Sequence, residues 1–513
     1  MPAISHLISA TTAVLLSLAL PAHAAEFATD PVRPWLSVNG FGTVGMAHSD
    51  EHGADYVFDN LQPFGSGRNR QWTGDVDSRL GLQLTANFTP QLSGVVQVVS
   101  EYRWNGTYRP LISWANLKYA VTPDLSVRVG RIGLASFLAS DSRRVGYSNI
   151  TARPPIEVYR LLALKESDGV DASYRIHAGD VSNTTSILYG KRTVTNTRGI
   201  DVHSTAVMGI FDTLERGPLT LHAAYQQRDV DNQNPPRGRF ASVGASWDPG
   251  EWFVSGELVR VSNYDGKRVK AIREAWYVNG GMRFGTLTPY VSVSDLRPLT
   301  DTGNIPVAQH TYAAGLRWDV ARNLDLKVQW DQLHLGANSY GTLQSVVAGT
   351  PRGGHVNVVS LLADFLLTGG PIMHKSIPHC LLAALLLAGS CSRAEVVVIV
   401  SARNTVKALS GEQAADLFLG KAVDFPNGQH AVPIDQSEGS PVRDVFYLRS
   451  SGKAPAQMKA YWAHMLFTGR GQPPVESGDS AAIKRLVADN PNLIGYIDRS
   501  ALDSSVRAVL SIH

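Results

Sequence analysis

The chain has 513 residues, of which 44% are hydrophobic, 18% are charged and 8% are aromatic, and its formal net charge is only +3. No apolar run reaches the roughly 18 residues that a membrane helix needs, long disorder is excluded by the aromatic content and low charge, and the charge gives no support to nucleic-acid binding. The two cysteines, Cys380 and Cys391, lie in one short apolar stretch. They leave neither a disulfide framework nor a cysteine metal site.

Residues 1–24 have the pattern of a secretory signal peptide. The segment from Leu7 to Leu20 is largely apolar, and Ala22-His23-Ala24 is a small-residue cleavage site. The alternative is a buried helix, but Pro21 would end it. The pattern therefore predicts export from the cytoplasm.

Residues 26–368 alternate between apolar and polar side chains with a period of two. Between Arg79 and Phe88, for example, Leu80, Leu82 and Leu84 fall on one face and polar residues fall on the other. A strand with one apolar and one polar face suits a barrel with lipid outside and water inside. A soluble β-sandwich would show the same alternation and is the alternative.

Sixteen such strands are predicted, and they alternate between short turns and long polar connections. Short turns on one rim and long loops on the other are typical of outer-membrane barrels, and an even count places both chain ends at the short-turn rim, in the periplasm. The strand centres are predicted near Val38, Leu82, Val96, Ala115, Val127, Ala172, Ile187, Met208, Ala223, Val243, Gly256, Val278, Val291, Ala314, Val328 and Val359.

Strand number, rim asymmetry and the long 132–169 segment resemble the trimeric general porins of Gram-negative bacteria. This resemblance implies a homotrimer in outer-membrane lipid that passes small solutes without catalysis or cofactors, and a loop after the fifth strand that narrows the pore. Opposed charges across such a constriction sort solutes by charge, which makes anion preference a hypothesis; the alternative is a solvated surface loop. The predicted constriction and lumen residues are Arg128, Arg131, Arg143, Arg144, Arg153, Arg160 and Glu157.

A second signal-like pattern occupies the 369–394 linker. Met373 and Lys375 precede an apolar core from Cys380 to Ala388, which small residues follow. A start-like Met with a full signal pattern inside one chain suggests two neighbouring genes joined, naturally or by a missed stop. An apolar linker helix is the alternative.

In residues 395–513 the period of the hydrophobic pattern changes, and the new pattern predicts a small α/β domain. Glu395 to Val400 is a continuous apolar run, as in a strand buried on both faces. A capping box at Ser410 opens a helix predicted over 413–419, and further helices are predicted near 455–468 and 480–489.

A loop between a strand and a helix is the predicted binding site of this domain. The strand ending at Ile434 leads through Ser437 to Ser440-Pro441, a helix start. Free N–H groups at such a point bind anions, and Arg443 could reach an oxyanion with two hydrogen bonds. A capped helix with a surface arginine is the alternative.

This region resembles the phosphate-binding proteins of ABC transporters, specifically their short single-domain relatives. The resemblance rests on Leu409 to Lys421, Phe425 to Gly428, the serine-rich loop, Tyr461-Trp462 and Ile494 to Ile497. In the family loop Arg-x-Asp-Gly-Ser-Gly-Thr, Gln436 replaces the Arg and Glu438 the Asp, while Ser440 is kept. The resemblance implies a phosphate site formed by Ser437, Glu438, Gly439, Ser440, Arg443 and Asn404.

The combined prediction is an outer-membrane porin joined to a periplasmic phosphate-binding-like domain, with no enzyme activity, metal or nucleic-acid partner. An outer-membrane enzyme is one alternative, but the histidines, such as His203, His222, His310 and His334, do not cluster in the sequence. A second alternative is two separate proteins, with residues 395–513 acting as a sensing or interaction module outside transport.

Overall fold

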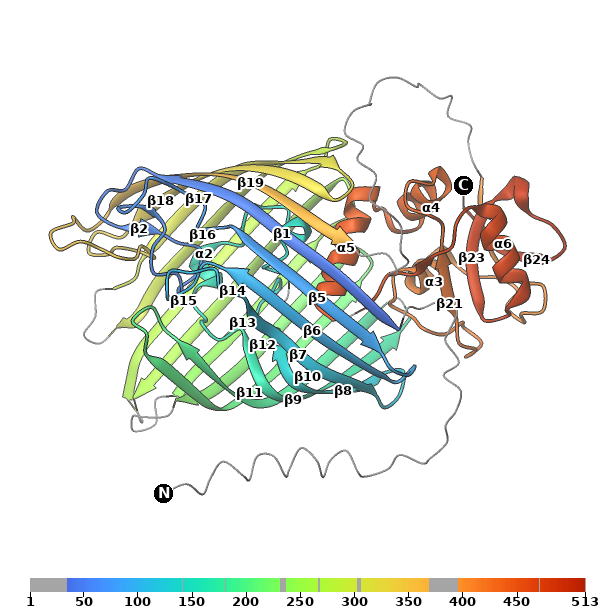
Figure 1. The fold of residues 1–513 in the computed structure, drawn as a ribbon, viewed down its shortest axis with the longest axis horizontal. Coiled ribbons are helices and arrows are strands. Elements are labelled where there is room, and N and C mark those ends of the chain that lie inside the picture. The colour runs from blue at the N-terminus through green and yellow to red at the C-terminus, as the bar shows by residue number, and fades with distance from the viewer. Residues whose placement is uncertain are drawn as a thin grey trace.

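The computed structural model describes residues 35–140, 142–179, 181–230, 237–265, 268–301, 306–368, 395–469 and 471–512. The predicted signal segments 1–24 and 369–394 lie outside the described residues. The described chain forms a large β-barrel and a smaller α/β unit placed at one end of that barrel (Figure 1). We refer to residues 395–512 as the C-terminal unit.

The barrel is closed by sixteen antiparallel strands, which confirms the predicted number. Each strand pairs with its neighbour in sequence, and β19 pairs back with β1 from Asn39↔Thr368 to Ser49↔Val358. The strands are β1 (Leu36–Ser49), β5 (Arg79–Asn87), β6 (Leu92–Glu101), β7 (Leu111–Ala120), β8 (Leu125–Gly133), β9 (Glu166–Ala178), β10 (Val181–Thr195), β11 (Asp201–Arg216), β12 (Leu219–Val230), β13 (Arg237–Trp247), β14 (Trp252–Asp265), β15 (Arg268–Met282), β16 (Leu287–Asp301), β17 (Gln309–Ala321), β18 (Leu324–Leu335) and β19 (Gly354–Thr368).

The two faces of each strand meet different surroundings. On β5, Leu80, Leu82 and Leu84 are 43%, 48% and 40% exposed, whereas Arg79 and Gln83 on the opposite face are buried inside the barrel. A sandwich would bury the leucines in a sealed core, so the sandwich alternative is wrong. The apolar face lies outside, as a lipid-facing barrel surface requires.

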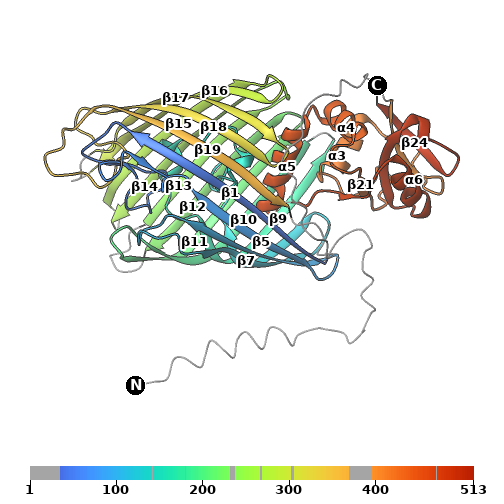
Figure 2. The ribbon, with the colours of Figure 1, turned by 45° about the horizontal axis from the view of Figure 1, so that its top comes forward.

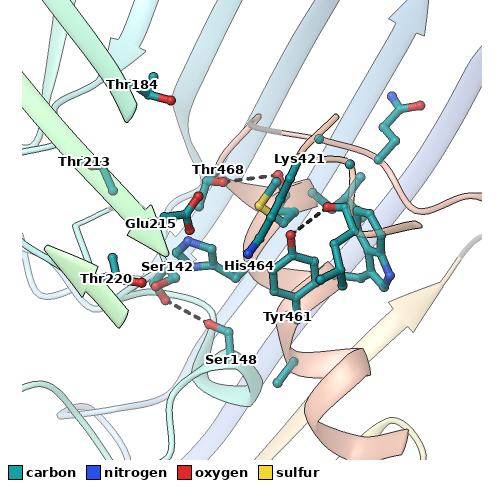
Figure 3. A pocket seen from close by; sticks show the side chains of 18 of the residues that line it. Ser142, Ser148, Thr184, Thr213, Glu215, Thr220, Lys421, Tyr461, His464 and Thr468 are labelled. Atoms are coloured by element: carbon teal, nitrogen blue, oxygen red, sulfur yellow. Dashed lines mark hydrogen bonds between the residues drawn. The ribbon is translucent and has the colours of Figure 1, made fainter. Parts of the chain in front are cut away.

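We therefore expect an outward charge to destabilise the barrel strongly. Leu82→Arg places a guanidinium on the lipid face near the middle of β5, and such a change costs about 2–4 kcal/mol near the bilayer midplane. Thr184→Arg is the matched control, because Thr184 faces the internal cavity (Figure 3). Urea unfolding in lipid vesicles measures the difference. Equal losses for both variants would contradict the outward placement of Leu82.

The two rims differ as predicted. Connections at one rim are two to four residues long, such as 88–91, 121–124 and 322–323. The other rim carries longer segments, including 50–78 with the short strands β2 (Asp55–Tyr56), β3 (Ser66–Gly67) and β4 (Trp72–Thr73). The alternation of short and long connections also predicts a long polar loop over residues 262–272. This prediction is wrong, because β14 extends to Asp265 and β15 begins at Arg268.

Exposed aromatic side chains gather at the short-turn rim, near the strand ends. Rings at this level are what a membrane interface favours, because they combine an apolar body with a polar edge. They are Phe88, Tyr119, Trp247, Trp252, Phe284 and Trp318.

The C-terminal unit is a mixed five-stranded sheet in the order β22-β21-β23-β20-β24, covered by helices. Strand β20 is fully buried, in agreement with its continuous apolar run. The elements are β20 (Val396–Ser401), α3 (Gly411–Phe418), β21 (Val432–Asp435), α4 (Pro441–Ser451), α5 (Pro455–Phe467), β22 (Val475–Glu476), α6 (Ser480–Asp489), β23 (Leu493–Asp498), η2 (Arg499–Ala501) and β24 (Val506–Ile512).

Local signals set the helix ends of this unit. The capping box is present, since Ser410 Oγ accepts a hydrogen bond from Gln413 N and Gln413 Oε1 accepts one from Ser410 N. Helix α3 therefore begins at Gly411, two residues before the predicted start. The edge strand β24 was not predicted from the sequence.

Candidate functional site

One long connection enters the barrel. Residues 134–165, which we call the lumen loop, join β8 to β9 and carry the short helices η1 (Gly146–Ser148) and α2 (Ile156–Tyr159). The loop bonds to wall strands on different sides: Ser136 Oγ donates to Gln226 Oε1 on β12 at 2.9 Å, and Arg153 reaches β18. The structure thus places the segment after the fifth barrel strand inside the barrel, as predicted.

Arg153 is the centre of a buried ion-pair network in the lumen. Its Nε and Nη2 atoms donate to the two oxygens of Asp77 at 2.9 and 2.6 Å, and its Nη1 atom donates to Asp331 at 3.2 Å. Tyr56 and Ser360 accept further bonds from the same guanidinium at 3.1 and 2.6 Å. A bidentate arginine–carboxylate pair is among the strongest charge-assisted contacts, so Arg153 fixes the lumen loop to the wall.

Arg144 and Arg143 are buried beside each other on the same loop. Arg144 donates to Glu166 at 2.6 Å and to Glu101 at 3.1 Å. Arg143 Nη2 has no hydrogen-bond partner among the described residues. Neither side chain is free to meet a passing ion.

The other predicted lumen residues are also held by contacts within the barrel. Carboxylate partners reduce the net field of Arg144 and Arg153 at a solute, and Arg143 is buried. The placement of these three residues therefore does not support the expectation that they set ion preference. The partners are Asp171 for Arg128, Asp168 for Arg131, the Thr342 carbonyl for Arg160, and Ser294, Gln309 and Thr311 for Glu157.

Apolar side chains hold the lumen loop against one side of the wall. Phe137 stacks on Tyr159 with ring centroids 4.6 Å apart, and Phe137 also meets Phe240 on β13 edge to face at 4.9 Å. Buried side chains of the loop and of strands β10 to β16 form one cluster with these rings. The loop is therefore packed like a core segment at this level of the barrel.

A cavity of about 2000 Å³ lies between the lumen loop and the short-turn rim. Ser142 and Ser148 of the loop bound it on one side, and Tyr461 and His464 of α5 bound it on the other. Figure 3 shows these side chains together with Thr184 and others from the barrel wall. The cavity thus belongs jointly to the barrel and the C-terminal unit.

Three cations on adjacent strands face this cavity: Lys118 on β7, Arg128 on β8 and Arg175 on β9. We call them the cationic row. Lys118 is the register partner of Arg128, and Arg128 Nε donates to Asp171 at 3.0 Å. Among the described residues, neither Lys118 nor Arg175 makes an ion pair, so the row keeps a net positive charge. Lys118 could have been predicted, because the alternation of β7 points it inward.

Carboxylates line the same cavity, so it is not uniformly basic. Asp248 is paired with Arg283 at 2.7 Å, and Asp319 is paired with Arg317 at the same distance. Glu215 on β11 also faces the cavity (Figure 3). The positive charge near the cationic row therefore comes from the local arrangement of these side chains and not from the net charge of the cavity wall.

In the C-terminal unit, Arg443 points at a buried carboxylate. Arg443 Nε donates to Asp435 Oδ2 at 3.0 Å, and the hydroxyls of Tyr447 and Tyr496 also donate to Asp435. Burial raises the pKa of Asp435. The positive charge predicted to bind phosphate is thus paired with a carboxylate inside the fold.

The other donors of the predicted phosphate loop are largely occupied. The backbone nitrogens of Ser437 and Ser440 donate to carbonyls, and that of Glu438 donates to the carboxylate of Glu476 at 3.1 Å. Ser440 Oγ donates to Gln436 Oε1 at 2.7 Å, where a helix cap was expected. The phosphate site stays a prediction, and these contacts weigh against it.

Asn404 is not brought to that loop. It follows the end of β20, where Asn404 Nδ2 donates to the Pro491 carbonyl at 2.6 Å and its Oδ1 accepts from Val406 N. Strand β20 runs antiparallel to β23, and β21 runs parallel to β23. Asn404 and the loop after β21 therefore lie at opposite ends of the sheet, which separates Asn404 from the rest of the predicted set.

Three histidines that are distant in sequence lie side by side on the barrel. His310, His334 and His355 are register partners on β17, β18 and β19, and His334 and His355 have ring centroids 4.3 Å apart. Within the described ranges, no group of three or more His, Cys, Asp or Glu side chains could hold a metal ion. Among the helices of the described chain, none is long and apolar enough to cross a membrane.

No model of a protein family and no curated protein matches the sequence. Among solved structures, an anion-selective porin from Comamonas acidovorans is 14% identical with a TM-score of 0.46, over 65% of this chain and 99% of that chain. The outer membrane channel DcaP of Acinetobacter baumannii is 13% identical with a TM-score of 0.45, over 65% and 97%. Identities and TM-scores of this size identify neither a family nor a function.

Proposed function

We propose that residues 35–368 form an outer-membrane porin that lets small solutes diffuse passively, with a preference for anions. The observation that carries this proposal is the closed sixteen-stranded barrel with an apolar outer face and a polar wall around an internal cavity of about 2000 Å³. Such a structure buries its backbone in lipid and leaves water inside. The proposal includes a homotrimer and a periplasmic short-turn rim.

The cationic row supports the anion preference. Lys118 and Arg175 have no acidic partner among the described residues, and Arg128 is paired with Asp171. A unit charge about 5 Å from a permeating ion in water contributes roughly 0.8 kcal/mol. That energy corresponds to about a fourfold change in relative permeability for each charge.

Removing two of these charges should shift selectivity toward cations. In planar bilayers under a potassium chloride gradient, we expect Lys118→Gln/Arg175→Gln to lower the anion-to-cation permeability ratio roughly fifteenfold, as two contributions of about 0.8 kcal/mol imply. The reversal potential reports this ratio directly. The control is Arg109→Gln/Arg198→Gln, which changes the same net charge in the exposed connections of the other rim. An unchanged reversal potential in the first variant would remove the cationic row from the selectivity filter.

The second candidate function concerns the C-terminal unit as an interaction module outside transport. It is favoured by the contacts of this unit with the barrel rim, for example Gln457 Nε2 donating to the Gly250 carbonyl at 2.8 Å. An immunoblot against residues 395–513 tests whether cells contain the joined 55.5 kDa chain. A smaller band alone would mean that the unit acts as a separate periplasmic protein.

A further inference from the structure

Part of the lumen wall is apolar where water is expected. Phe41 on β1, Val99 on β6 and Leu366 on β19 all point inward, and Phe41 and Leu366 are register partners at the closure of the barrel. We call these three residues the lumenal apolar patch. Their neighbours in the wall, such as Gln83 and Gln97, are polar. In a water-filled lumen the patch would be exposed, yet Phe41 and Val99 are buried.

The end of α5 covers this patch. Ala463 and Phe467 pack on it, and the rings of Phe41 and Phe467 meet edge to face with centroids 4.9 Å apart. Val145 and Tyr147 of the lumen loop complete the same cluster. Helix α5 therefore touches the barrel wall and the lumen loop together.

Polar contacts fix the C-terminal unit around the rim. On the wall, Gln83 Nε2 donates to the Leu466 carbonyl at 2.9 Å, and at the β17–β18 turn Arg322 Nη1 donates to the Glu438 carbonyl at 3.1 Å. A third contact joins α5 to the β13–β14 turn at Gly250. Both views place α5 across the end of the barrel, with the sheet of the unit farther out (Figures 1 and 2).

Close backbone approach supports a formed interface. A Cβ atom added to Gly250 would lie 2.4 Å from the Gly452 carbonyl oxygen. Only glycine leaves room for this backbone contact. At the β17–β18 turn the Arg322 guanidinium lies directly against Gly439. The C-terminal unit thus contacts two turns of the rim and, inside the barrel, the lumenal apolar patch.

We propose that the C-terminal unit is a plug that closes this channel from the periplasm, with α5 as the element that blocks the mouth. The proposal rests on the proposed porin function, because it assumes a channel to close. Burial of Phe467 against Phe41 stabilises the closed state, and contact of α5 with η1 also holds the lumen loop. Separation of α5 from the patch opens the mouth to the cavity.

Two variants of the full chain release the plug from opposite sides. Phe467→Asp places a carboxylate in the apolar cluster from the helix, and Phe41→Gln makes the wall polar without altering the C-terminal unit. The control is Leu486→Asp, which puts the same charge on an exposed apolar position of α6, a helix that packs on the sheet of the unit. In planar bilayers we expect roughly a tenfold or greater rise in the open fraction of the release variants, and parental behaviour of the control.

Thiol labelling reports docking independently of current. In a chain with Cys380→Ser and Cys391→Ser, an Ala463→Cys thiol should be protected from a water-soluble maleimide in vesicles, because Ala463 is buried in the same cluster and the Phe467 ring is kept. Adding Phe41→Gln should make this thiol react at least tenfold faster. A heat-modifiability gel shows that the barrel of each variant is folded.

The outcomes separate the plug from the porin. A higher open fraction together with faster labelling supports the plug. A parental chain that conducts as well as the release variants overturns the plug and leaves the porin intact. If labelling shows that α5 has left but no variant conducts, the proposed porin function fails and the plug fails with it. A protected thiol in a fully conducting chain means that α5 docks without blocking.

Discussion

Arg153→Met is expected to lower the free energy of unfolding of the barrel by about 3–5 kcal/mol, because removing one partner of a buried ion pair leaves charge without compensation. Arg153 is 3% exposed and binds both Asp77 and Asp331. Methionine keeps much of the side-chain length but provides no donor. Asp331 would then stay buried with only neutral partners, and Asp77 would keep only Arg79, whose Nη2 atom lies 3.9 Å from its carboxylate. Equilibrium unfolding in lipid vesicles, followed by tryptophan fluorescence, measures the loss.

Two companion variants identify the cause. Arg109→Met is the control, because Arg109 is exposed in a connection of the long-loop rim, and we expect it to change stability by less than about 0.5 kcal/mol. The triple variant Arg153→Met/Asp77→Asn/Asp331→Asn should regain most of the stability, since replacing all members of a buried network is much less costly than removing one. A parental stability for Arg153→Met alone would show that the network does not hold the lumen loop.

Arg443→Met should destabilise the C-terminal unit by about 3 kcal/mol at neutral pH, for the same reason. Asp435 is fully buried and would keep only the hydroxyls of Tyr447 and Tyr496. Pulse proteolysis of the full chain in urea measures this unit while the barrel stays folded. The matched control is Arg449→Met, an exposed arginine on the same helix. If Arg443 instead served only a phosphate site, its loss would abolish phosphate binding in calorimetry and leave stability unchanged.

The pH dependence of that loss has a defined sign. Burial raises the pKa of Asp435 above its unfolded value of about 3.9, so between these two pKa values the folded state binds more protons than the unfolded state. Stability linked to this group is therefore greatest below the unfolded pKa and falls as pH rises through the folded pKa. Without Arg443 the carboxylate should protonate more readily. The difference between parent and variant should then shrink as the pH is lowered toward 4.

The strands of the barrel could be predicted from local patterns in the sequence. The side-chain pairs between distant residues could not. The alternation around Leu82 is visible within ten residues and defines both faces of a strand. The partners of Arg153 cannot be found in this way. Asp77, just before β5, and Asp331, on β18, come close to Arg153 only after the barrel has closed. Alternation along one strand therefore indicates which side chains face the lumen, but it carries no information on which carboxylates will pair with them.

The C-terminal unit shows the same limit. The capping box at Ser410 and the buried strand β20 follow from neighbouring residues, and both were predicted. The use of Arg443 depends on Asp435, eight residues earlier, pointing inward from the end of a strand. Asn404 was joined to the loop by resemblance, but the antiparallel course of β20 carries it to the far end of the sheet. The docking of α5 had no sequence signal except the inward-facing apolar residues Phe41, Val99 and Leu366, which interrupt the polar side of the alternation.

Closure of the barrel through β1 and β19 implies an order of events during assembly. Phe41 and Leu366 are more than 300 residues apart in the chain and become neighbours only when these strands pair. Bringing such distant residues together has a large entropic cost and is slow, whereas α5 and the sheet of the C-terminal unit form from contacts much closer in sequence. The surface that receives Phe467 is thus assembled late, at the seam itself. A C-terminal unit that folds early therefore has no docking surface until β1 and β19 have paired. Docking of this unit would then occur only on a completed barrel.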